Sequence, residues 1–115
     1  MNSENNSVNQ SLRPFARELP ADAEKYTKLI QDGESEKLQA GYIVLQPGEE
    51  VGSHNSGKYE ELIIVLEGEG IVEADPIGSQ SVSANKIAYN PPNTQHNVIN
   101  TGEAPLRYIF VLSCK

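Results

Sequence analysis

The chain has 115 residues, which suits one domain with its own core and is short for two. With 37% hydrophobic and 22% charged residues it has a globular composition, and no apolar run reaches the roughly 18 residues of a membrane span. The formal net charge of −7 would repel phosphate groups, so the sequence predicts neither a nucleic-acid partner nor a membrane partner.

The first residues, MNSENNSVNQS, are polar and lack basic groups ahead of an apolar stretch, so they do not resemble a secretory signal. We therefore expect a cytoplasmic protein. The lone Cys114 agrees with this, because one cysteine cannot form a disulfide within the chain. The Asn- and Ser-rich start predicts a disordered arm over residues 1–12, followed by a single domain over residues 13–115.

The rest of the chain has the pattern of short strands. Residues 20–33 fit either a helical turn or a strand, and we favour a strand because all later segments read that way. AGYIVLQPGE is a β-rich run that stops at a Pro-Gly turn, and ELIIVLEGEGIVEAD reads as two strands forming a hairpin around Gly68–Gly70. KIAYNPPNTQHNVIN and APLRYIFVLS supply three further strands, so the sequence predicts an all-β antiparallel sandwich or barrel.

Side-chain alternation along ELIIVLEG gives two apolar faces. Glu61 shares one face with Ile63 and Val65, whereas Leu62 and Ile64 occupy the other. A sheet with one solvated face would show polar residues at alternate positions. We therefore expect the outer face to be covered by another layer, by the N-terminal segment or by a second subunit, and we predict a homodimer formed through sheet faces.

The sequence contains two histidines, His54 and His96, and each begins a predicted strand. Glu61 lies on a core-type face, where an unpaired carboxylate would be costly to bury. Two imidazoles and one carboxylate would form a site for iron, manganese, zinc or nickel with open positions for a ligand. The alternative is a pair of hydrogen-bonded histidines without metal, with Glu61 paired to Lys58 or capping the backbone.

The spacing of these residues resembles that of two known motifs. The first runs Gly48, five residues, His54-Asn55-Ser56, four residues, Glu61, six residues, Gly68, and the second runs Asn85, five residues, Pro91-Pro92-Asn93, two residues, His96, three residues, Asn100. Both are similar to the motifs of the cupins, and the resemblance covers about residues 40 to 112.

The resemblance implies an all-β, double-stranded β-helix or jelly-roll cupin barrel, with a divalent metal held by His54, Glu61 and His96. Ser56 stands where the family usually has a further histidine ligand, and a hydroxyl is a poor replacement for it. A weakly held metal and an empty site both stay open. Asn85 and Asn93 replace family glycines, a mild change because asparagine tolerates left-handed backbone.

Five side chains are candidates for lining a substrate pocket, although strand aromatics are usually core residues and a serine here could be a plain turn residue. They are Tyr42, Gln46, Ser56, Tyr89 and Tyr108.

Three functions fit these residues. The first is a metalloenzyme of oxygenase, isomerase or lyase type that acts on a small polar metabolite. The second is a binding or sensory module for a small ligand such as a sugar or organic acid, and the third is a structural dimer with an empty site. No dedicated general base is evident, because both histidines are assigned as ligands, so proton transfer would fall to Glu61 or to metal-bound water.

Overall fold

The structure, a computed structural model, describes residues 12–21 and 24–114. The predicted disordered arm falls almost wholly on residues outside this part of the chain. The described residues form nine strands and no helix: β1 (Tyr26–Lys28), β2 (Leu38–Leu45), β3 (His54–Asn55), β4 (Tyr59–Glu67), β5 (Glu69–Ala74), β6 (Gly78–Ser83), β7 (Ile87–Asn90), β8 (Gln95–Ile99) and β9 (Leu106–Cys114). None of the described segments is a helix that could cross a membrane.

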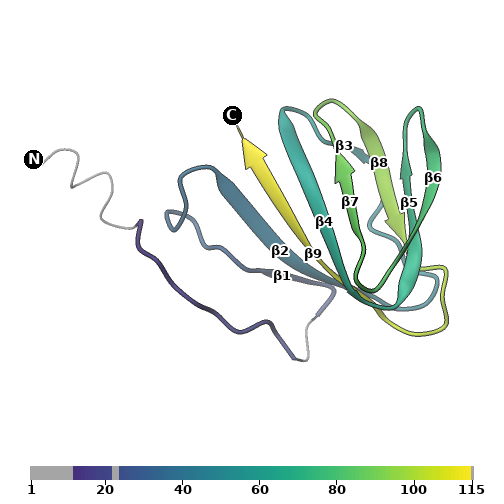
Figure 1. Cartoon of the computed structure of the whole chain (residues 1–115), viewed down its shortest axis with the longest axis horizontal. Coiled ribbons are helices and arrows are strands. Elements are labelled where there is room, and N and C mark those ends of the chain that lie inside the picture. The colour runs from purple at the N-terminus through teal and green to yellow at the C-terminus, as the bar shows by residue number, and fades with distance from the viewer. Residues whose placement is uncertain (1–11, 22–23, 115) are drawn as a thin grey trace, which may run out of the picture.

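The strands build two antiparallel sheets. One has five strands in the order β1-β2-β9-β4-β7, and the other has four in the order β3-β8-β5-β6. Figure 1 shows the long strands β2, β9 and β4 side by side on one side of the barrel, with β5, β6 and β8 on the other. Consecutive strands therefore often belong to different sheets, which is the arrangement of a jelly roll.

The core lies between the two sheets. On β4 the inward side chains Ile63 and Val65 are almost fully buried, and Glu61 shares their face as the alternation predicted. Leu106 and Tyr108 of β9 continue this face beside them. Residues of both sheets complete one apolar cluster: Ile43, Leu45, Ile63, Val65, Val72, Val82, Val98, Leu106 and Tyr108.

The predicted hairpin around Gly68–Gly70 is wrong. β4 pairs with β7 and β9, whereas β5 pairs with β6 and β8, so the chain crosses from one sheet to the other at Gly68. Gly68 has a φ of 86°, and a Cβ atom there would meet the Pro105 carbonyl and Leu106. A glycine is required at this corner because the backbone is left-handed and a neighbouring strand passes close to it.

The outer face of the five-stranded sheet is apolar and only partly covered. Leu62 and Ile109 are half-buried there, and on the edge strand β7 Ile87 and Tyr89 are 68% and 54% exposed. The homodimer inferred from this face stays a prediction. Light scattering tests it: the mass of two chains would support the dimer, and the mass of one chain would refute it.

Candidate metal centre and binding pocket

The three predicted ligands come together in space although they are far apart in the chain. His54 of β3 lies directly opposite His96 of β8 in the strand register, and their ring centroids are 4.3 Å apart in an edge-on arrangement. Glu61 of β4 approaches from the facing sheet. His96 and Glu61 are buried, whereas His54 is exposed.

A close contact joins the two buried groups. His96 Nε2 lies 3.0 Å from Glu61 Oε1, and the Asn90 side-chain amide donates to the same oxygen, also at 3.0 Å. The His96 nitrogen is nevertheless buried without a hydrogen-bond partner of good alignment. We therefore regard the contact as mainly electrostatic, because its distance suits an ion pair but its angle does not suit a hydrogen bond.

Both imidazoles are anchored through the same ring nitrogen. His54 Nδ1 lies 2.8 Å from the Gly52 carbonyl oxygen, and His96 Nδ1 lies 2.9 Å from that of Thr94. A carbonyl can only accept, so each Nδ1 carries the proton and donates it. In the neutral rings this leaves both Nε2 lone pairs unprotonated, as in histidines that bind a metal through Nε2.

The buried pair perturbs the titration of both partners. Burial is the strongest single influence on Glu61 and raises its pKa, but the contacts with His96 and Asn90 outweigh burial and lower the pKa overall. The Glu61 carboxylate raises the pKa of His96, burial opposes this, and the Thr94 carbonyl reinforces it. Without a metal, the pair therefore favours an imidazolium beside a carboxylate.

The spacing of two of the three predicted ligands can be compared with that of ligands around a divalent ion. Two ligands that lie about 2.1 Å from an ion at a right angle are about 3.0 Å apart, which is close to the separation of His96 Nε2 and Glu61 Oε1. Among residues 12–21 and 24–114, however, no three His, Cys, Asp or Glu side chains are spaced as a complete metal site. A three-ligand site would therefore require the side chains of His54, Glu61 and His96 to rearrange.

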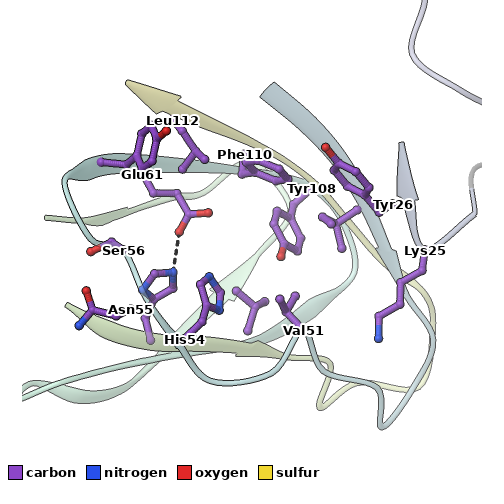
Figure 2. Close-up of a pocket in the computed structure, with 14 residues that line it drawn as sticks. Lys25, Tyr26, Val51, His54, Asn55, Ser56, Glu61, Tyr108, Phe110 and Leu112 are labelled. Atoms are coloured by element: carbon purple, nitrogen blue, oxygen red, sulfur yellow. Dashed lines mark ion pairs between the residues drawn. The ribbon is translucent and has the colours of Figure 1, made fainter. Parts of the chain in front are cut away.

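These three residues line one side of a cavity of about 460 Å³. In Figure 2, Glu61 points toward the imidazole of His96, the Tyr108 hydroxyl points into the cavity, and Lys25 lies on the far side. The remaining walls are largely apolar. The full lining consists of Lys25, Tyr26, Ile43, Val51, His54, Asn55, Ser56, Tyr59, Glu61, His96, Val98, Tyr108, Phe110 and Leu112.

Comparison with known proteins supports the resemblance found in the motifs. The family model of the cupin domain matches residues 41–112, which is more than half of the chain. The chain belongs to the cupin family. No curated protein matches the sequence.

Solved cupins share the fold at low sequence identity. A cupin protein from Bacteroides fragilis has a TM-score of 0.76 and 16% identity, covering 87% of this chain and 83% of its own. An RmlC-like cupin from Methanocaldococcus jannaschii, with a double-stranded β-helix fold, has a TM-score of 0.71 and 23% identity. The match covers 88% of this chain and 91% of the Methanocaldococcus protein. A predicted oxalate decarboxylase from Thermotoga maritima has a TM-score of 0.64 and is 23% identical to this chain. The match covers 67% of this chain and 66%, just under two thirds, of the Thermotoga protein.

In this cupin, two of the five predicted lining residues, Ser56 and Tyr108, line the cavity. Tyr42 is buried near the Arg107 side chain, and its face of β2 is opposite to that of Ile43, which does line the cavity. Gln46 follows the end of β2 in an exposed loop.

Tyr89 also lies outside the cavity. Its hydroxyl donates to Glu60 at 2.7 Å, and the ring is 54% exposed on the edge strand. Tyr89 is opposite Leu62 in the register, and Leu62 alternates with the inward Glu61, so Tyr89 lies on the outer face of the sheet.

The Ser56 hydroxyl is engaged in joining two turns. It donates to the Pro91 carbonyl at 2.6 Å and accepts from the Thr94 backbone amide at 2.9 Å. The Ser56 amide also donates to the Thr94 carbonyl at 3.0 Å. Ser56, which stands where the family usually has a histidine, thus connects the β3–β4 turn to the segment leading into β8. Its hydroxyl proton is donated to the Pro91 carbonyl.

Sequence reasoning missed part of the lining. Phe110 could have been found, because it shares strand parity with Tyr108. Asn90, which donates to Glu61, gave no signal before the β4–β7 register was known. Lys25 and Tyr26 join the cavity because β1 pairs with β2 at the edge of the sheet, and no local pattern shows this.

Proposed function

We propose that this chain is a small-molecule-binding cupin in which His54, Glu61 and His96 hold a divalent ion (zinc, iron, manganese or nickel) at the polar side of the pocket. The proposal rests on one observation: both histidines donate through Nδ1 to backbone carbonyls, and the remaining Nε2 of His96 is buried, lacks a hydrogen-bond partner and faces Glu61. A divalent ion bound there would polarise an oxygen of the ligand.

The chain's own residues would orient the ligand beside that ion. Tyr108 is buried, and burial together with the Glu61 carboxylate raises its pKa, so the hydroxyl stays protonated as a donor. The apolar walls would exclude water from the bound molecule. A reaction of oxygenase, isomerase or lyase type is compatible with this arrangement, and one structural neighbour is named a predicted oxalate decarboxylase.

The second candidate is a binding or sensory module without metal or turnover. It is favoured by the contact between His96 and Glu61, which can exist as an imidazolium–carboxylate pair with no ion between them. It is also favoured by Ser56, whose hydroxyl already bonds to the backbone of two turns.

Elemental analysis separates the two candidates. We expect protein purified without added metal, or reloaded after chelation, to carry about one divalent ion per chain, and His54→Ala and His96→Ala each to lose it. Gln95→Ala is the matched control, because Gln95 precedes His96 on β8 but is exposed and bonds to Ser53. Metal-free wild-type protein that also fails to reload would refute the metal site and leave the binding module.

If metal is present, a metabolite screen that follows oxygen uptake and substrate loss tests for turnover. Consumption of a compound by the wild type but not by His96→Ala would establish an enzyme. A ligand that raises the melting temperature and is recovered unchanged would instead support the binding module.

A further inference from the structure

An aromatic platform forms part of the pocket wall. The rings of Tyr26 and Phe110 stack with centroids 6.0 Å apart and planes inclined by 16°, and both line the cavity. Gly41 permits this, because a Cβ atom at that position would collide with both rings. A flat or branched apolar group placed against this wall would bury its apolar surface.

The hydroxyl of a largely buried tyrosine faces the same space. Tyr108 is 3% exposed, and among the residues that the structure describes its hydroxyl has no hydrogen-bond partner. Figure 2 shows this hydroxyl directed into the cavity between the histidine side and Lys25. The hydroxyl is not among the buried unpaired atoms of the described residues, so it is open to the cavity and available to donate to an acceptor of a bound molecule.

One positively charged side chain, the exposed Lys25, lies among the lining residues. Lys25 is the single lysine or arginine of the fourteen, in a chain whose net charge is −7. Its Nζ donates to the Glu50 carbonyl at 3.0 Å, and no carboxylate of the described residues forms an ion pair with it. An ammonium has three donors, so two remain for a ligand.

We propose that the ligand is a small organic carboxylate with an aromatic or branched aliphatic body. Its carboxylate would lie at Lys25, its body on the platform of Tyr26 and Phe110, and an acceptor atom at the Tyr108 hydroxyl. The inference rests on the proposed function as a small-molecule binder, and it predicts that such carboxylates bind more tightly than sugars.

The test is a set of calorimetric titrations of the full chain with benzoate, hydrocinnamate and isocaproate, each compared with its neutral amide and with glucose. We expect at least one carboxylate to bind about tenfold more tightly than its amide, and glucose to bind more weakly than either. Lys25→Met should remove the preference for the carboxylate over the amide. Tyr108→Phe should weaken both compounds alike.

Lys28→Met is the matched control and should change neither affinity, because Lys28 pairs with Asp32 and does not line the cavity. Equal affinity for acid and amide, or a preference that survives Lys25→Met, would overturn the carboxylate assignment and leave the small-molecule binder standing. Failure of every acid, amide and sugar to bind would overturn the carboxylate assignment, whereas the metal site of the proposed function is tested separately by elemental analysis.

Discussion

His54 and His96 face each other across one strand pair and have the same Nδ1 anchor, yet their surroundings differ. His96 is buried against Glu61 of the opposite sheet, whereas the imidazole of His54 is exposed and, among the described residues, is hydrogen-bonded to the Gly52 carbonyl alone. The same chemical group can therefore stabilise the fold on β8 and be available to a ligand on β3. Substitutions of each histidine, followed by measurements of stability and of metal content, should show whether the two residues differ in this way.

The largest expected effect comes from His96→Ala in metal-free protein. Removal of the imidazole leaves the buried Glu61 carboxylate with Asn90 as its one described hydrogen-bond donor, so we expect a loss of about 3 kcal/mol in the free energy of unfolding. Urea denaturation in the presence of chelator measures it. A loss no greater than that of His54→Ala would break the contrast between the two histidines.

The contact between His96 and Glu61 should also make the stability of the protein depend on pH. The contribution of His96, whose pKa is raised from 6.5, is complete below that value and is lost as the pH rises through the folded-state pKa. The contribution of Glu61, whose pKa is lowered from 4.5, is complete above that value and is lost as the pH falls through the folded-state pKa. In metal-free protein, the His96–Glu61 pair should thus contribute most to the free energy of unfolding between pH 4.5 and 6.5.

Thermal unfolding of the wild type and of Glu61→Gln, within this range and beyond both ends of it, measures the effect. The glutamine variant keeps the size of the side chain but removes its charge, so its stability should vary less than that of the wild type as the pH falls below 4.5 or rises above 6.5. Parallel curves for the two proteins would show that the pair makes no such contribution.

Ser56→Ala should have a smaller effect. The substitution removes the bond to the Pro91 carbonyl and leaves the Thr94 amide without its acceptor, and we expect a loss of about 1 kcal/mol. Metal content should stay as in the wild type, since the Ser56 hydroxyl proton is used by the backbone. Loss of metal with unchanged stability would instead make Ser56 a ligand.

The smallest effect on stability is expected for His54→Ala. Its side chain is exposed, so the free energy of unfolding of the metal-free protein should change by less than about 0.5 kcal/mol. Urea denaturation alongside His96→Ala gives the comparison directly. A large loss would show that His54, like His96, serves the fold.

The sequence predicted the parts of the fold that follow from alternation. The inward position of Glu61 beside Ile63 follows from strand parity, and the motif spacing correctly placed His54 near His96. The hairpin at Gly68 was wrong because a glycine turn looks alike in sequence whether it reverses a strand or carries the chain to another sheet.

The pocket was harder to predict than the fold. Tyr42 and Tyr89 suit strands equally well on either face, and only the register shows that both lie away from the cavity. Lys25 enters the cavity through the pairing of β1 with β2, a contact between distant segments that no local pattern encodes. Side chains fixed by long-range strand pairing thus escaped the sequence analysis.

The central claim is that the buried and the exposed histidine act together on one ion. Nitrogen-detected NMR of both imidazoles during titration with Zn²⁺ tests it most directly. The account predicts that Nε2 of His54 and Nε2 of His96 shift together and saturate at one ion per chain, while each Nδ1 keeps its proton. A response from one ring alone, or from neither, would contradict it.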